Sequence, residues 1–141
     1  VQQDGRISQS GLGEQVHFST AAVPRRLRSL QQEGVIRKLG AVLSGPALGH
    51  PLTIITEVAT ERERTDLLDA MKAAFHDCPQ VQQCYYVTGA CDFIIVFVVR
   101  DMAQYTALTR KLFFHNNNVR SFTTYVVMDC VKVSLDVPFH D

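Results

Sequence analysis

Five basic side chains lie close together near the start of the chain. They are Arg25, Arg26, Arg28, Arg37 and Lys38. The first three fall within a segment of helical periodicity, and the last two follow it. A helix fits the major groove of B-DNA, where guanidinium groups pair with phosphates or bind guanine bidentately. The spacing is therefore typical of a DNA-contacting helix, although a solvated basic face whose arginine stems cover apolar surface would give the same pattern.

The cysteines and histidines form no obvious catalytic or metal-binding set. None of the four cysteines belongs to a C-x-x-C pair, and together they are too dispersed for a site of three or four zinc ligands. We interpret them as reduced thiols of a cytosolic protein. His50, His76, His115 and His140 are scattered beside expected helix or strand ends, where surface or capping roles are typical. The sequence therefore predicts no metal, no cofactor and no enzymatic activity.

The composition of the 141 residues is that of a soluble globular protein, with 46% apolar and 20% charged residues. Lysine plus arginine and aspartate plus glutamate both number 14, which excludes a uniformly basic nucleic-acid coat. No apolar run approaches the roughly 18 residues of a membrane helix. The polar start VQQDGRISQS predicts no signal peptide. We therefore expect a cytoplasmic protein with no membrane contact.

The zero net charge hides an imbalance between the two parts of the chain. Residues 1–45 carry six basic and three acidic groups, and residues 46–141 carry eight basic and eleven acidic groups. Their net charges are therefore +3 and −3. Such a split suggests a module that meets an anion, joined to one that does not. Chance alone would also produce an imbalance of this size.

The first 40 residues predict a winged helix-turn-helix domain. Ser8 caps a short helix, and after a tight turn Ser19 caps a second one. The apolar stripe of the second helix repeats at i, i+4 and i+7 and comprises Val23, Leu27 and Leu30. Gly34 fits a helix stop, and residues 35–39 are typical of a short basic strand. A hinge rich in glycine and proline follows over residues 41–51.

Residues 52–141 predict a ferredoxin-like βαββαβ domain, so that the whole chain is of the α+β class. The expected order is a strand over 52–58, a helix over 61–75 capped by Thr60, strands over 80–88 and 92–100, a helix capped by Asp101, and strands over 119–128 and 131–137. The inward residues of the two helices are expected to be Leu67, Leu68, Met71, Ala74, Phe75, Met102, Tyr105, Leu108 and Leu112. The run FIIVFVV is typical of a central strand buried on both faces.

One sheet face of such a domain lacks helices and needs cover, which a second copy of the chain would supply. A homodimer is therefore expected. Of the four strand aromatics Tyr85, Tyr86, Phe122 and Tyr125, we expect at least half to face that interface. The alternative is that they belong to the core of the single chain.

The two parts together resemble the Lrp/AsnC (feast/famine) transcriptional regulators from end to end. The matching strings are DGRIS (4–8), STAAVPRRLRSLQQEGVIR (19–37), GAVL (40–43), VTGACDF (87–93), DMAQY (101–105) and TYVVMDCVK (124–132). The resemblance implies a DNA-binding domain, an effector domain of the RAM type, and dimers through the sheets that assemble up to tetramers or octamers. It also implies a small effector, usually an amino acid, and a location at the nucleoid in the bacterial or archaeal cytosol.

The resemblance also assigns site residues. For double-stranded DNA they are Ser19, Thr20, Ala21, Arg25, Arg26, Arg28, Arg37 and Lys38. For the effector they are Val87, Thr88, Gly89, Asp92, Phe93, Thr123, Thr124 and Tyr125. Gly89 allows close backbone approach, turn N–H groups can hold a carboxylate, and Asp92 can take an ammonium group. Asp92 is equally typical of a turn residue that bonds its own backbone.

Departures from the family pattern keep other functions open. Gly11 weakens the capping box of Ser8, and His17 replaces a turn glycine. Pro24 lies five residues after the expected cap Ser19, just past the helix positions that tolerate proline. The family's first helix is nearly absent before residue 4. A metabolite-binding oligomer with degenerate DNA binding is therefore an alternative. Ala90 stands where many members have a second acid, which argues against a strongly cationic effector.

A remote alternative is an enzyme that resembles sirohaem decarboxylases. Those relatives place histidine and arginine residues in the strand-loop region. Here the same region reads QQCYYVTGACDF and contains neither. Cys84 and Cys91 lie near the expected effector site, as reactive thiols or as buried inert ones.

Overall fold

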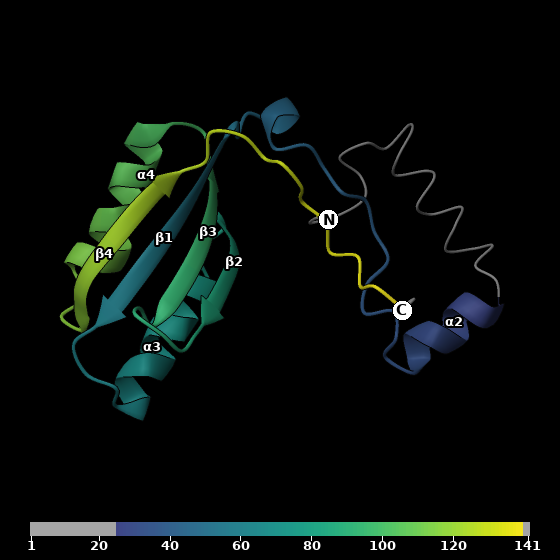
Figure 1. Cartoon of the computed structure of the whole chain (residues 1–141), viewed down its shortest axis with the longest axis horizontal. Coiled ribbons are helices and arrows are strands. Elements are labelled where there is room, and N and C mark those ends of the chain that lie inside the picture. Colours follow the sequence, from purple (N-terminus) through teal and green to yellow (C-terminus); the bar gives the residue numbers. More distant parts are fainter. Residues whose placement is uncertain (1–24, 140–141) are drawn as a thin grey trace. The chain divides into compact units, whose positions relative to one another are not determined.

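The computed structural model describes residues 25–139, and it divides the chain into two compact units, Val1–Ser44 and Gly45–Asp141 (Figure 1). Each unit is described by itself. The helix expected after Ser8, the cap at Ser19 and the departures at Gly11, His17 and Pro24 all lie outside the described residues.

In the first unit, helix α2 (Arg25–Gln32) ends in a glycine-dependent cap. Gly34 has a φ of 84°, in the left-handed region. Its N–H bonds the carbonyl of Gln31 at 3.1 Å, and the N–H of Val35 bonds the carbonyl of Leu30 at 2.8 Å. This pair of bonds is the Schellman motif, which satisfies the last carbonyls of a helix. The helix stop predicted at Gly34 is confirmed.

The short strand expected over residues 35–39 does not form among the described residues, so this prediction is wrong. The N–H groups of Val35 and Ile36 both bond the carbonyl of Leu30 and so close the end of the helix. These two N–H groups are therefore unavailable for hydrogen bonds to a neighbouring strand.

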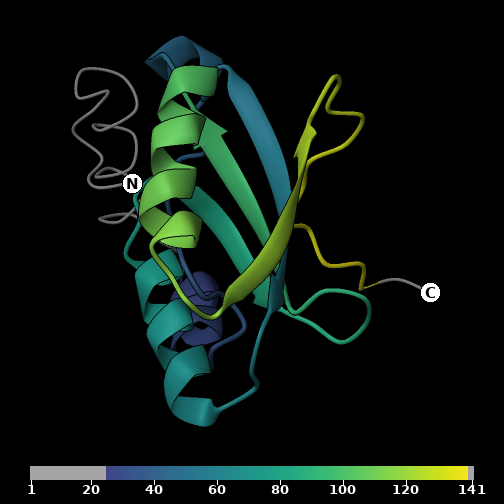
Figure 2. The ribbon, with the colours of Figure 1, turned by 90° about the vertical axis from the view of Figure 1, so that its left-hand side faces the viewer.

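The second unit is a four-stranded antiparallel sheet with the strand order β2-β3-β1-β4. Its strands are β1 (Leu52–Thr60), β2 (Val81–Tyr86), β3 (Phe93–Val99) and β4 (Val119–Val126). A 3₁₀ turn, η3 (Pro46–Leu48), precedes β1. Helices α3 (Thr65–His76) and α4 (Met102–Thr109) lie together on one face, and α4 runs on into a π-helical turn, η4 (Arg110–Phe114) (Figure 2). The predicted α+β class and ferredoxin-like order are confirmed, and β3 is central as expected.

The core lies between the helices and every second residue of the two central strands. Ile54, Val58, Phe93 and Phe97 are all completely buried there. From the helix side, the inward residues Leu68, Met71, Phe75, Tyr105, Leu112 and Phe113 complete it. Burial of each large apolar side chain stabilises the fold by roughly 1.5–3 kcal/mol.

A buried hydroxyl chain crosses this core. The Tyr105 hydroxyl lies 2.9 Å from Thr56 Oγ1 and 2.7 Å from Thr124 Oγ1. Thr56 is fully buried and Tyr105 nearly so. The two threonines are register partners on β1 and β4. The tyrosine therefore satisfies polar groups that would be costly to bury alone, and it ties α4 to both strands.

The start of α3 differs from the expected one. Thr60 does not cap it, because Thr60 is still part of β1 and the helix begins at Thr65. Asn118 accounts for the delay: its Oδ1 accepts the N–H of Arg62 at 2.9 Å, its Nδ2 donates to the Arg62 carbonyl at 3.0 Å, and its own carbonyl accepts the N–H of Glu61. These bonds hold the segment before α3 as a loop.

The inward stripes of the helices are only partly as expected. Leu68, Met71 and Phe75 are buried, but Leu67 is half-buried and Ala74 is exposed, because these two residues share a side of the helix that borders an open pocket. Asp101 caps α4 as predicted, and its Oδ1 accepts the N–H of Gln104 at 2.8 Å. Met102 was expected inside and is 43% exposed.

The last expected strand, over residues 131–137, is also wrong for the single chain. A strand requires a ladder partner, and in the described part of the chain this segment pairs with neither edge of the sheet. Its apolar residues nevertheless alternate with polar ones. Val131, Val133, Leu135 and Val137 are each at least 75% exposed.

Candidate functional site

The sheet face away from the helices is uncovered. We call it the open face and define it by alternation and register as Thr53, Ile55, Glu57, Gln83, Tyr85, Ile94, Val96, Val98, Thr123 and Tyr125. Tyr85 and Tyr125 point to this face. Tyr86 and Phe122 are opposite the core residues Phe93 and Val58 and so point to the helix side. Half of the four strand aromatics thus lie on the open face, as expected.

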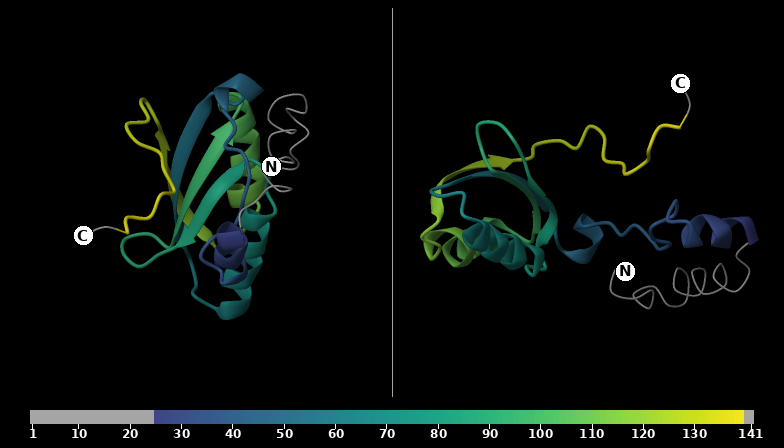
Figure 3. Two further views of the ribbon diagram at one scale, coloured as in Figure 1. Left: turned by 90° about the vertical axis from the view of Figure 1, so that its right-hand side faces the viewer. Right: turned by 90° about the horizontal axis from the view of Figure 1, so that it is seen from below.

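The loop between β2 and β3 leaves the sheet on the side of the open face (Figure 3). The N–H of Val87 bonds the carbonyl of Asp92 at 2.8 Å and closes the loop at its base. Gly89 has a φ of 124°, a conformation that residues with a Cβ adopt only under strain, so that the tip of the loop depends on glycine.

Asp92 fastens this loop to the end of β1. Its Oδ2 accepts the N–H of Thr60 at 2.7 Å and the hydroxyl of Thr60 at 2.9 Å. Its own N–H donates to the carbonyl of Val58 at 2.8 Å. Oδ1 has no hydrogen bond to any residue that the structure describes. Asp92 is therefore first a structural anchor, with one oxygen left over.

The structure separates the predicted effector residues into two groups. Thr88, Gly89, Thr123 and Tyr125 are exposed, and Val87 and Asp92 are half-buried beside them. Phe93, in contrast, is completely buried, edge-to-face against Phe75 with ring centroids 5.2 Å apart. The Thr124 hydroxyl bonds Tyr105 on the helix side. Phe93 and Thr124 thus support the site from behind.

Sequence reasoning missed Glu57. Its register partners are Ile94 on β3 and Thr123 on β4, so that it lies on the open face next to the loop. It is half-buried, and its carboxylate makes no hydrogen bond or ion pair with any residue between 25 and 139. The signal was present: within LTIITEVAT, Glu57 has the opposite parity to the buried residues Ile54, Thr56 and Val58.

The thiols near the loop are held in their protonated form. Burial raises the pKa of Cys84 above its usual value. Burial, followed by the negative charges of Glu57 and Asp92, raises the pKa of Cys91. A raised pKa lowers the thiolate fraction at neutral pH, so both cysteines are poor nucleophiles there.

The basic residues of the first unit are exposed. Arg25, Arg26 and Arg28 on α2, and Arg37 and Lys38 after it, form no ion pair with the described part of the chain. Because these five residues are exposed, an anion can reach them from solvent. Ser19, Thr20 and Ala21 lie outside the described residues.

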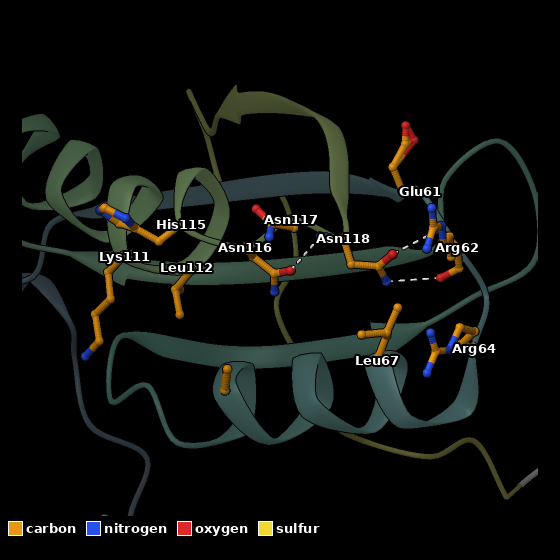
Figure 4. A pocket seen from close by; sticks show the side chains of 11 residues that line it. Glu61, Arg62, Arg64, Leu67, Lys111, Leu112, His115, Asn116, Asn117 and Asn118 are labelled. Atoms are coloured by element: carbon orange, nitrogen blue, oxygen red, sulfur yellow. Dashed lines mark hydrogen bonds between the residues drawn. The ribbon is translucent and has the colours of Figure 1, made fainter.

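A separate cavity of about 610 Å³ lies on the helix side, between α3 and the turn after η4 (Figure 4). It is lined by Arg62, Arg64, Lys111 and His115, and by Asn118, whose hydrogen bonds to Arg62 are described above. Arg64 is already paired with Asp66 at 2.8 Å. The cavity contains none of the residues that the sequence predicts for DNA or effector.

Neither a metal-binding cluster nor a membrane-spanning helix is present in the part of the chain that the structure describes. Residues 25–139 contain no group of three or more histidine, cysteine, aspartate or glutamate side chains that could hold a metal ion. Among the helices within 25–139, none has the length and apolarity needed to cross a membrane.

Two family models match the chain. Residues 53–137 match the Lrp/AsnC ligand binding domain, and residues 1–37 match a winged helix-turn-helix DNA-binding domain. Among curated proteins, an uncharacterized HTH-type transcriptional regulator, y4tD of Sinorhizobium fredii, is 39% identical over 98% of this chain and 82% of its own length. The leucine-responsive regulatory protein of Haemophilus influenzae is 32% identical over 94% of this chain and 80% of its own.

Solved structures share the fold. A transcriptional regulator from Neisseria meningitidis, in complex with L-methionine, has a TM-score of 0.75 at 23% identity and covers 81% of this chain and 73% of its own. AsnC of Escherichia coli has a TM-score of 0.72 at 16% identity, over 94% of this chain and 91% of its own.

Proposed function

The chain belongs to the Lrp/AsnC family of transcriptional regulators and carries both a DNA-binding and a ligand-binding domain. On this basis we propose how it recognises DNA and a small-molecule effector. It is a DNA-binding transcriptional regulator that responds to a small molecule. We propose that this effector is an amino acid and that it changes assembly or DNA affinity. The proposed domains are residues 1–40 for DNA, 41–51 as hinge, and 52–141 for effector and assembly.

The DNA interface is assigned to α2 and the segment after it. The observation that carries this assignment is the set of exposed arginines on α2, which form no ion pair with any residue between 25 and 139. In a winged helix-turn-helix the second helix enters the major groove, and dimers read two half-sites about one helical turn apart or a multiple of it. Arg25, Arg26 and Arg28 would contact phosphates or bases, and Arg37 and Lys38 the DNA backbone. Ser19, Thr20 and Ala21 are proposed as further DNA contacts on the strength of the family resemblance.

The effector site is assigned to the loop between β2 and β3 and the strands beside it. Val87, Thr88, Gly89, Asp92, Thr123 and Tyr125 line it, and Phe93 and Thr124 hold them in place. Exposed turn N–H groups suit a carboxylate. An amino acid is further supported by structural neighbours whose crystals contain L-methionine, from Neisseria meningitidis and from Mycobacterium tuberculosis.

A second copy of the chain is the proposed cover for the open face. Ile55, Val96 and Tyr125 leave an apolar surface without helices over it, and the exposed alternating segment at 131–137 lacks a strand partner within the described chain. Burying both against a second sheet would yield roughly 25 cal/mol for each Å² of apolar area. The proposed state is a homodimer that can assemble into tetramers or octamers.

The proposed location is the cytosol, and no catalytic role is proposed, since the family is one of transcriptional regulators. A metabolite-binding oligomer that no longer binds DNA remains the second candidate. The specific observation in its favour is the group of departures at Gly11, His17 and Pro24 in the DNA-binding domain.

Fluorescence anisotropy tests the proposal. The full-length protein is titrated onto a labelled duplex from the DNA upstream of its own gene, over a range of salt, with and without a pool of the 20 amino acids. Tight binding with a steep salt slope, shifted by the pool, is the expected result. Affinity no better than for an unrelated duplex, with normal amino-acid binding, would contradict the regulator and favour the second candidate.

A further inference from the structure

We propose that Glu57 binds the ammonium group of the effector, so that this site requires a ligand with a primary ammonium group. The inference rests on the proposed function, because it names the chemistry that the effector site reads. It assigns the charge recognition to a residue of β1 rather than to the loop alone.

The first argument is position. Glu57 faces Ile94 and Thr123 across the two strand pairs, and Ile94 follows the loop by two residues. The loop projects on the side of the sheet away from the helices (Figure 3), and the strand register places Glu57 on that same side. The negative charge of Glu57 contributes to the raised pKa of Cys91, which lies within the loop. One small molecule lying against the loop would therefore be within reach of this carboxylate.

The second argument is that Glu57 has no partner. A half-buried carboxylate among Ile55, Ile94 and Tyr125 loses hydration without gaining a hydrogen bond from the described residues. Such groups are normally paired, because an ionised carboxylate is costly to remove from water. A ligand ammonium would supply the missing partner.

The third argument is that Asp92, the other acidic residue of the site, already accepts hydrogen bonds within the chain. Asp92 Oδ2 accepts two hydrogen bonds from Thr60 and fixes the loop. A ligand that drew Asp92 away would loosen its own binding site. Glu57 can contact a ligand without such a cost. Exposed loop N–H groups beside Gly89 then remain for the carboxylate of the same ligand.

The assignment also links the ligand to assembly. If a second sheet covers the open face, the unpaired carboxylate of Glu57 must be desolvated, which opposes association. A bound ammonium offsets that penalty. The effector is therefore expected to favour the assembled state, and a neutral residue at position 57 is expected to favour it without effector.

Calorimetry on the full-length protein tests this inference. The 20 L-amino acids are screened against the wild-type protein, and the tightest binder is compared with its α-hydroxy acid, in which a neutral hydroxyl replaces the ammonium group. The wild-type protein is expected to prefer the amino acid by at least about tenfold, the worth of one charged hydrogen bond. Glu57→Gln is expected to lose that preference, and Glu57→Asp to retain part of it. Glu61→Gln, on an exposed loop, is the control and should bind like the wild type.

The outcomes separate the two proposals. Equal preference for the amino acid in the wild-type protein and in Glu57→Gln would overturn this inference and leave the effector site intact. Failure of every amino acid to bind the wild-type protein would overturn the proposed effector and this inference with it. Analytical ultracentrifugation of Glu57→Gln without ligand is the second measurement. A shift toward larger assemblies than wild type supports the inference, and an unchanged or smaller assembly contradicts it.

Discussion

The Asp92 carboxylate holds Thr60 by two hydrogen bonds to the same oxygen, at 2.7 Å from the backbone nitrogen and 2.9 Å from the hydroxyl. Thr60 ends β1 and Asp92 directly precedes β3, so the pair locks the loop beside the open face to the neighbouring strand. Thr60, expected to cap a helix, instead positions the loop between β2 and β3.

Asp92→Ala should destabilise the effector domain by about 1–3 kcal/mol, because it leaves two buried donors of Thr60 without an acceptor. Urea denaturation measures the loss. Asp77→Ala, at an exposed aspartate after α3, is the control and should change stability by less than about 0.5 kcal/mol. Equal stability of the two variants would show that the Thr60 contact contributes little.

Tyr105→Phe should also cost about 1–3 kcal/mol, since Thr56 is fully buried and would lose its hydroxyl partner. Tyr85→Phe is a matched control, because its hydroxyl bonds only Gln83 on the exposed surface. Thermal unfolding followed by circular dichroism compares the two. A smaller loss for Tyr105→Phe than for Tyr85→Phe would contradict the buried hydroxyl chain.

Glu57→Gln should speed the alkylation of Cys91. The pKa of Cys91 is raised by burial and by two negative charges, so removing one charge lowers that pKa and increases the thiolate fraction. The difference between variant and wild type should be present near neutral pH and vanish at a pH above both pKa values. Site-resolved mass spectrometry after iodoacetamide treatment measures it, with exposed Cys130 as the internal reference. A slower reaction of Cys91 in the variant would show that the charge of Glu57 does not raise the pKa of Cys91.

Arg26→Ala should weaken DNA binding and, if Arg26 contacts a phosphate, lower the salt slope by about one. The anisotropy titration described above measures both quantities. Arg110→Ala removes an exposed arginine of the effector domain and should leave both unchanged. Unaltered affinity and slope in Arg26→Ala would remove this residue from the interface.

Val96→Asp should disrupt the proposed dimer, because it introduces a charge in the middle of the open face between Ile55 and Gln83. Light scattering coupled to gel filtration reports the mass. Ala70→Asp, on the exposed side of α3, is the control that should keep the wild-type mass. A Val96→Asp protein that is folded by circular dichroism and still dimeric would rule out the open face as the interface.

Local signals predicted several features of both units. Asp101 caps α4 and the FIIVFVV run forms a central strand in the second unit, and Gly34 ends α2 in the first. Each depends on neighbouring residues or on one alternating pattern, which a sequence displays directly. The start of α3 could not be found in this way, because Asn118 controls it from 56 positions further along the chain.

The candidate site shows the same difference between features that depend on local sequence and features that depend on distant residues. The loop and its glycine were recognisable from the string VTGACDF, whereas the inward direction of Phe93 and Thr124 depends on the pairing register. Glu57 was overlooked for a related reason. Its place beside the loop exists only once β1 lies between β3 and β4. The segment over residues 131–137 has the alternating pattern of a strand, but residues 25–139 of a single chain provide no strand that pairs with it.

The sheet order has a consequence for the protein during its synthesis. β1 is the first strand to leave the ribosome, and one of its two neighbours, β4, is the last. At translation rates of about 5–20 residues per second, β1 waits several seconds for β4 after its own completion. During that interval one edge of a largely apolar strand stays unpaired, which is an opportunity for contact with other nascent chains.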